Sequence, residues 1–132
     1  MSLLRRALSL GAGLLAASSL ALLIAPGWLT DQLLDRSETP GDVWLRLLGA
    51  AGFSLALVHV LIVRKLDDLW WWTWAIVAFH LMVAVVTVLH AIAGSPNGSA
   101  TWPWLILTAT SAGFTAAFLA GLARAGQDKP FV

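Results

Sequence analysis

The chain has 132 residues, of which 59% are hydrophobic and only 11% are charged, and its formal net charge is +1. Because a soluble domain carries about 25% charged residues, this composition predicts a single membrane domain over residues 1–132. No basic face is available to meet phosphate, which argues against a nucleic-acid partner. The chain has no Cys, which excludes disulfides, iron–sulfur clusters, thiolate metal sites and cysteine nucleophiles.

Four apolar runs are each long enough to cross a bilayer, whose hydrocarbon core of roughly 30 Å needs about 20 residues of helix. The first run follows the basic pair Arg5-Arg6. We interpret this pair as a cytoplasmic anchor, because the apolar run behind it is longer than that of a usual signal peptide. The predicted spans are residues 3–24, 43–63, 69–93 and 102–123.

The connections contain the turn formers and much of the charge. Residues 25–28, Ala-Pro-Gly-Trp, end the first span, and Thr30 is expected to cap a short turn on the membrane surface. Residues 64–68 form a tight turn into the third span. The last connection is uncharged, and Pro103 suits the first turn of the fourth span because its missing N–H would be unpaired there. The side chains expected on the surface in the short turn are Trp28, Leu29, Leu33 and Leu34.

Basic residues and tryptophans predict the same orientation. The basic residues gather on one side of a four-span chain, and the positive-inside rule makes that side cytoplasmic, so both termini are expected there. They are Arg5, Arg6, Arg64, Lys65, Arg124 and Lys129, against Arg36 and Arg46 on the other side. Tryptophan favours membrane interfaces. An outer belt of Trp28, Trp44, Trp102 and Trp104 is predicted, and an inner belt of Trp70, Trp71, Trp72 and Trp74.

Small residues recur along three of the spans and predict close helix contacts. Membrane helices approach each other through such residues, because Leu gains little by leaving lipid. Each stripe could face another helix of the same chain or receive a neighbouring protein. The stripes are Ser9, Gly13, Ala17, Ala21 and Ala25; Gly49, Gly52 and Ala56; and Ala109, Gly113, Ala117, Gly121 and Ala125.

Ionisable side chains within the spans are candidate site residues, because such groups are costly in hydrocarbon and usually functional. They are Arg46, His59, His80 and His90. Counted along the spans, His59 and His80 differ in depth by roughly 9 Å. This separation argues against a bis-His haem within one subunit, and against one metal held by all three histidines. A single axial ligand for a haem or chlorophyll-type pigment stays open, as does a second histidine from another subunit. The alternative is helix–helix hydrogen bonding.

Polar residues also form a stripe along the third span, made of His80, Thr87 and His90, that could face Arg46 across the bundle. A pocket of Arg46, Thr87 and His90 would open outward and suit an anionic or quinone-like head group. Alternatively, Arg46 reaches lipid phosphates and the acidic connection, as long basic side chains near helix ends commonly do. A comparable stripe on the fourth span consists of Thr108, Ser111 and Thr115.

Catalysis and transport have little support in the sequence. No Asp or Glu falls within a predicted span, so no buried acid–base pair is available for hydrolysis or proton relay. We therefore expect no enzyme activity. A short chain without inverted repeats or broken helices also disfavours transport, unless a path forms between subunits.

Two stretches, Ala25-Pro26-Gly27-Trp28 and Trp44-Leu45-Arg46-Leu47-Leu48-Gly49-Ala50, resemble small four-helix bacterial membrane proteins of the DoxX-like and DUF4345-like type. The resemblance implies a four-helix fold over most of the chain. For some DoxX-type proteins it also implies quinone-linked or thiol-linked respiratory partners. This chain departs from the thiol-linked pattern because it has no Cys, and the family has no single function to transfer.

These features predict an all-α, integral membrane four-helix bundle in a bacterial cytoplasmic membrane, with both termini inside. The expected function is a non-catalytic accessory or assembly subunit of a larger respiratory or photosynthetic complex. Its expected partners are the lipid bilayer and either other membrane subunits or further copies of the chain. One alternative is a homo-oligomeric solute transporter or channel. The other is a binding protein for a quinone, haem, pigment or lipid, with candidate residues His80, His90, Arg46, His59 and Thr87.

Overall fold

The computed structural model describes residues 1–34, 42–93 and 101–128, and within these ranges the regular structure is entirely helical. Four helical segments are long and apolar enough to cross a membrane, which confirms the predicted all-α chain with four such segments. The helices are α1 (Ser2–Ile24), α2 (Pro26–Leu34), α3 (Asp42–Arg64), α4 (Leu66–Leu69), the short 3₁₀ helix η1 (Trp70–Trp72), α5 (Thr73–Ala93) and α6 (Trp102–Asp128).

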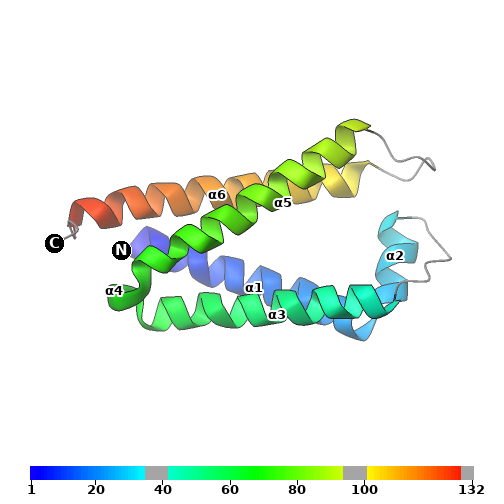
Figure 1. The fold of residues 1–132 in the computed structure, drawn as a ribbon, viewed down its shortest axis with the longest axis horizontal. Coiled ribbons are helices and arrows are strands. Elements are labelled where there is room, and N and C mark those ends of the chain that lie inside the picture. Colours follow the sequence, from blue (N-terminus) through cyan, green and yellow to red (C-terminus); the bar gives the residue numbers. More distant parts are fainter. Residues whose placement is uncertain (35–41, 94–100, 129–132) are drawn as a thin grey trace.

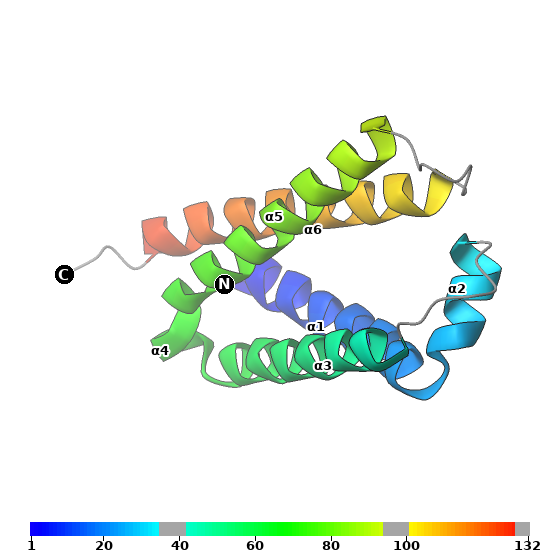
Figure 2. The ribbon, with the colours of Figure 1, turned by 45° about the vertical axis from the view of Figure 1, so that its right-hand side comes forward.

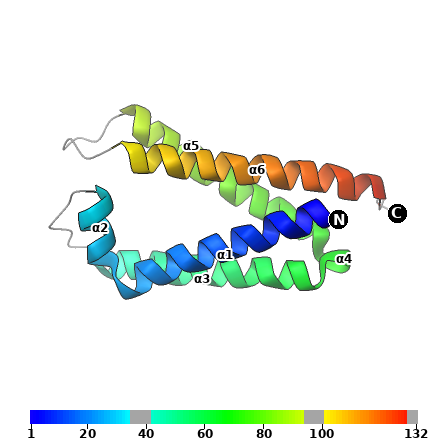
Figure 3. The same cartoon turned by 180° about the vertical axis from the view of Figure 1, so that it is seen from behind.

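The long helices form two antiparallel pairs, α1 with α3 and α5 with α6 (Figure 1). Contact between α1 and α6 joins the pairs. The N-terminus, α4 and the last turns of α6 lie together at one end of the molecule, which we call the termini end (Figure 3). The pairs diverge from there toward the opposite end, where α2 lies (Figure 2). The start of α1 and the end of α6 are therefore on one side of the four-helix arrangement.

Helices α1 and α3 lie close together because small residues meet between them. A methyl group added at Gly49 would lie 2.8 Å from the carbonyl oxygen of Ser19, and one added at Gly52 would collide with the Ser19 hydroxyl. Ala56, one turn further along α3, is also buried. The predicted stripe on α3 therefore does face another helix of the chain, at the close distance that small residues permit.

The stripe predicted on α1 points elsewhere. Its first residues, Ser9, Gly13 and Ala17, are exposed, and a methyl group at Gly13 would meet nothing within 4 Å. The buried small residues of α1 are instead Ala7, Gly11, Ala12 and Ser19. Spacing alone does not distinguish these two faces, because both carry small residues at helical intervals.

The stripe predicted on α6 divides into two halves. Near the termini end, Gly121 lies against Leu4 of α1, where an added methyl group would be 2.9 Å from the Leu4 Cδ1 atom, and Ala125 is fully buried. Toward the other end, Ala109 and Gly113 are exposed. Only the half beside α1 is used inside the bundle.

The core sits at the termini end, where all four long helices contribute. It consists of large aliphatic and aromatic side chains that interlock between the helix pairs, as close packing in protein interiors requires. Phe118 of α6 is the largest fully buried side chain. The other buried members are Leu4, Ala7, Leu8, Ile62, Leu66, Trp70, Ile76, Val77, Leu122 and Ala125.

Pro26 separates α1 from α2, as the sequence predicts. Helix α1 ends at Ile24, and α2 begins at Pro26, a position where the missing N–H costs no hydrogen bond. The predicted cap at Thr30 is wrong, because α2 already starts four residues earlier and Thr30 lies inside it. Trp28 is exposed and Leu29 half-buried. Three predicted features lie outside the described residues. They are the side chains of Leu33 and Leu34, residues 35–41 of the acidic connection, and the connection 94–100.

The turn between α3 and α5 is longer than predicted. Helix α4 and the 3₁₀ helix η1 occupy residues 66–72, so α5 begins only at Thr73. Trp70 is buried in the core, whereas Trp71 and Trp72 are half-exposed and lie ring against ring, with 4.9 Å between centroids. The fourth helix also extends further than predicted, to Asp128. The longer turn changes which residues of α3 and α5 lie at the same level.

Candidate functional site

The bundle brings two of the candidate histidines into contact. The imidazoles of His59 and His80 lie edge to face, with 6.1 Å between ring centroids. His59 is fully buried and His80 is 7% exposed. Phe114 and Phe118 of α6 pack against His80 at 5.3 and 5.4 Å, and Phe118 lies 6.2 Å from His59. We call these four residues the histidine cluster.

The expected separation of His59 and His80 is therefore wrong. The estimate of about 9 Å assumed that the third helix begins at residue 69, whereas it begins at Thr73. His59 lies five residues before the end of α3 at Arg64, and His80 lies seven residues after Thr73. The 6.1 Å between the two ring centroids is itself less than the expected difference in depth.

The histidine cluster touches all four long helices. His59 comes from α3, His80 from α5 and the two phenylalanines from α6. Gly11 of α1 completes it, because a methyl group added there would lie 3.4 Å from Phe118 Cζ and 3.6 Å from His59 Nε2. The cluster thus connects the α1/α3 pair to the α5/α6 pair. Each ring pair of this kind contributes about 0.5–1.5 kcal/mol beyond burial of its area.

Each histidine keeps one ring nitrogen without a partner. His59 Nδ1 lies 2.9 Å from the Leu55 carbonyl oxygen, and since a carbonyl only accepts, Nδ1 carries the proton. Among the described residues, the Nε2 atoms of His59 and His80 are buried without a hydrogen-bond partner. A buried polar atom without a partner is unfavourable by about 1–3 kcal/mol. The cluster therefore contains two buried polar atoms whose hydrogen-bonding capacity is unused.

A haem does not fit between these two histidines. Axial histidines hold the iron from opposite faces of a flat macrocycle, which extends well beyond both imidazoles. The ring of Phe118 packs against both His59 and His80, in space that such a macrocycle would need. Among the described residues there is also no group of three His, Cys, Asp or Glu side chains that could hold a metal ion.

Thr87 and His90 form a second set of contacts, between α5 and α6 toward the α2 end. The hydroxyls of Thr87 and Thr108 are hydrogen-bonded at 2.7 Å, and Thr108 also donates to the Trp104 carbonyl oxygen at 2.8 Å. The His90 ring lies 4.4 Å from that of Trp104. These side chains hold α5 against α6. The stripe of Thr108, Ser111 and Thr115 faces inward, with Ser111 and Thr115 buried.

Arg46 is bound elsewhere. Its Nη1 donates to the carbonyl oxygen of Leu23 at 2.9 Å, near the C-terminal end of α1. A cation is favourable beside the last carbonyls of a helix. Arg46, Thr87 and His90 thus contact Leu23, Thr108 and Trp104, respectively. The structure does not bring Arg46, Thr87 and His90 into contact with one another as the predicted pocket requires.

Sequence reasoning missed several residues that the structure places at these contacts. Phe114 and Phe118 have a helical spacing of four residues on α6, a signal that singles out one face without identifying its partner. Thr73 and Trp104 each bury a polar atom that has no partner among the described residues. Thr73 precedes His80 by seven residues, so the two share a face of α5.

The outer faces of α5 and α6 differ sharply in side-chain size. The exposed residues along one face of α6 are Ala109, Ala112, Gly113, Ala116, Ala120 and Ala123. We call this the small-residue face, and its spacing keeps all six residues within about a third of the helix circumference. The exposed face of α5 carries Leu81, Met82, Val85, Val86, Leu89 and Ile92. Bulky chains suit lipid, whereas small ones let another helix approach.

No family model, curated protein or solved structure matches this chain. The resemblance to DoxX-like proteins therefore rests on the two short sequence stretches alone.

Proposed function

We propose that the chain is a multi-pass protein of the bacterial cytoplasmic membrane and serves as a non-catalytic accessory or assembly subunit of a larger complex. Its four apolar helical segments support membrane insertion. So does the outer surface, where most of the large exposed side chains are aliphatic or Trp. A soluble monomer rarely exposes apolar patches of this extent.

The distribution of charge supports an orientation with both termini in the cytoplasm. Arg5, Arg6, Arg64, Lys65 and Arg124 belong to the helix ends that meet at the termini end (Figure 1). The positive-inside rule places such an end in the cytoplasm. Exposed Trp71, Trp72 and Trp74 would lie at the same interface, and exposed Trp28, Trp44 and Trp102 at the opposite one.

The small-residue face of α6 is the observation that carries the proposed role. A methyl group at Gly113 would meet nothing within 4 Å, although residues of this kind elsewhere in the chain, such as Gly49 and Gly121, lie directly against another helix. Because lipid gains little from packing against a face of small residues, a partner helix is the occupant that such a face suits best. The partner is either another membrane subunit or a second copy of the chain.

Co-purification of the protein from its native membrane in mild detergent tests this role. We expect larger membrane chains, or a second copy, to remain bound, and Gly113→Leu to reduce their recovery at least tenfold because the Leu side chain blocks close approach. The matched control is Ala78→Leu, which enlarges an exposed residue of α5 and should leave recovery unchanged. A wild-type protein that elutes alone as a monomer, or equal recovery from both variants, would contradict the proposal.

A second candidate function is binding of a small membrane ligand at the histidine cluster, and the unpaired Nε2 atoms of His59 and His80 favour it. The visible spectrum of the purified protein, with organic extraction for quinones, tests this. A pigment band or bound quinone that is lost in His80→Leu would support it. A colourless protein that carries no extractable ligand would exclude it and leave the cluster as a packing contact.

A further inference from the structure

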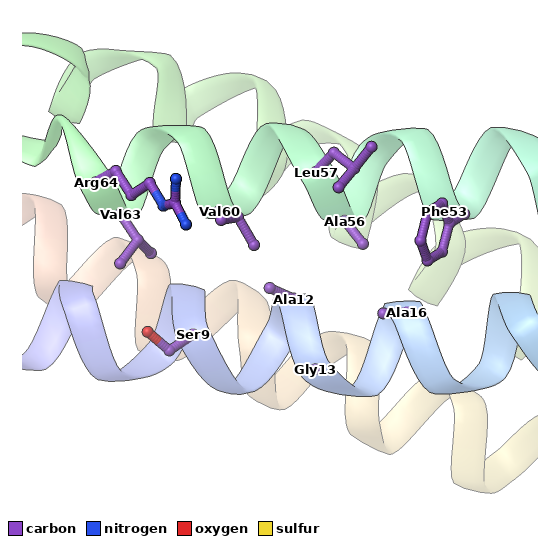
Figure 4. A pocket seen from close by; sticks show the side chains of 10 residues that line it. All are labelled: Ser9, Ala12, Gly13, Ala16, Phe53, Ala56, Leu57, Val60, Val63 and Arg64. Carbon is purple, nitrogen blue, oxygen red and sulfur yellow. The ribbon is translucent and has the colours of Figure 1, made fainter.

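A groove runs along the surface between α1 and α3, on the side where the predicted α1 stripe is exposed (Figure 4). Its volume is about 450 Å³, within the range of pockets that hold small molecules. Ala12, Gly13 and Ala16 of α1 and Ala56 of α3 are its small residues, and Phe53 and Leu57 project beside it from α3. The groove is lined almost entirely by apolar side chains, and it opens to the outer surface of α1 and α3.

The groove has one polar end. Arg64 of α3 lines it at the termini end, and Ser9 of α1 lines the opposite wall (Figure 4). Among the described residues, Arg64 has no ion-pair partner. Arg5 lies one turn before Ser9 on the same face of α1 and adds a second positive charge near this end. Basic charge at one end and apolar walls along the rest match an anionic amphiphile.

The length of the groove matches one leaflet of a bilayer. Its lining on α3 extends from Arg64 to Phe53, which is about 16 Å of helix at 1.5 Å per residue. Half of a hydrocarbon core of roughly 30 Å is about 15 Å. With Arg64 at the level of the head groups, Phe53 therefore lies near the bilayer midplane, so one acyl chain of the adjacent leaflet would lie along the groove.

We propose that this groove binds one anionic phospholipid of the surrounding bilayer, with an acyl chain between α1 and α3 and the phosphate on Arg64. The guanidinium offers two parallel N–H donors, which suit phosphate oxygens, and the Ser9 hydroxyl is a further donor. This assignment rests on the proposed membrane insertion but not on the proposed accessory role.

A helix suits the groove less well than a lipid. The small-residue face of α6 consists of Ala and Gly alone, whereas here the bulkier Phe53 and Leu57 line the groove beside its small residues. A partner helix lying across them would also cover Arg64 and remove its charge from water without an acidic partner, which is strongly unfavourable. A phospholipid supplies the counter-charge and the apolar chain in one molecule.

Native mass spectrometry of the protein, released from nanodiscs of phosphatidylcholine mixed with phosphatidylglycerol, tests the assignment. We expect one phosphatidylglycerol to stay bound at high collision energy. Arg64→Gln should lower its retention at least tenfold. Gly13→Leu should lower retention of both lipids, because its side chain enters the groove without meeting other atoms of the protein.

Arg124→Gln is the matched control, since it removes an exposed cation of α6 that does not line the groove. Retention that falls equally in Arg124→Gln and Arg64→Gln would overturn the proposal in favour of diffuse charge attraction. Unchanged retention in Arg64→Gln would also overturn it. Failure of the protein to enter nanodiscs would refute membrane insertion itself, and loss of partner chains in Gly113→Leu is measured separately.

Discussion

Helices α1 and α3 meet through glycine and a backbone oxygen, whereas α5 and α6 meet through hydroxyls and rings. In the first pair, Gly49 and Gly52 lie directly against Ser19. In the second, Thr87 binds Thr108 and the ring of His90 lies on that of Trp104. Both pairs are antiparallel and apolar, yet their contacts have little in common.

The difference shows two separate ways in which long apolar helices associate in this molecule. Close approach multiplies weak van der Waals contacts and depends on the absence of side chains. Polar and aromatic contacts depend on particular atoms and tolerate a wider spacing between helices. The first type should therefore be sensitive to added volume and the second to removed groups, and the histidine cluster, which joins the pairs, should be the most sensitive of all.

Phe118→Ala should have the largest effect, because it removes the ring that both histidines contact. Large-to-small changes of a fully buried Phe are unfavourable by about 3 kcal/mol or more through the cavity that they leave. Unfolding in mixed detergent–SDS micelles would measure this loss. Leu119→Ala is the control, because Leu119 is the next residue along α6 and its own side chain is exposed. Equal losses in the two variants would show that the cluster does not connect the helix pairs.

Gly49→Ala should be next, because its new methyl group would meet the Ser19 carbonyl oxygen, and a backbone atom cannot move aside. Overpacking of this kind is unfavourable by about 1–3 kcal/mol. Gly113→Ala should change stability in the opposite direction, by up to about 1 kcal/mol, because Ala is the better helix former and the site is open. The same unfolding assay measures both. A neutral Gly49→Ala would mean that α1 and α3 are not in glycine-mediated contact.

Thr87→Val should have the smallest effect, since it removes one hydrogen bond between helices, together with those of the same hydroxyl to the Val83 and Ala84 carbonyl oxygens of α5, and leaves the shape almost unchanged. Hydrogen bonds between membrane helices contribute about 0.6 kcal/mol on average. Thr108→Val removes the same bond from the other side, so the double variant should lose less than the sum of the two single losses. Strict additivity would show that the two hydroxyls do not interact.

The four helical segments that are long and apolar enough to cross a membrane could be predicted, because they depend on length and composition alone. The run from Thr73 to Ala93 and the break at Pro26 are both visible in the sequence. The rotation of each helix about its own axis, which decides which of its faces is buried, could not be predicted in the same way. Exposed and buried faces of a membrane helix are similarly apolar, so the spacing of Ser9, Gly13 and Ala17 gives no indication that they point outward.

The contact between His59 and His80 was missed for a different reason. Its prediction required the exact length of the turn, because each residue placed in the turn rather than in α5 moves His80 by 1.5 Å along the helix. The residues from Leu69 to Trp72 carry no charge and include three consecutive tryptophans, so the charge-free run begins four residues before α5. Hydropathy therefore does not mark the start of α5.

The contact between α1 and α6 has a consequence for biosynthesis. Leu4 belongs to α1 and its neighbour Gly121 belongs to α6, so the ribosome makes Gly121 only after the other three long helices. The α1/α3 hairpin can form while the rest of the chain is still being translated, since helices insert before they associate. Phe118 and Leu122, however, are made only after α1, α3 and α5. Until then Leu4 and His59 lack their contacts with Gly121 and Phe118, and a chain truncated before α6 would lack them permanently.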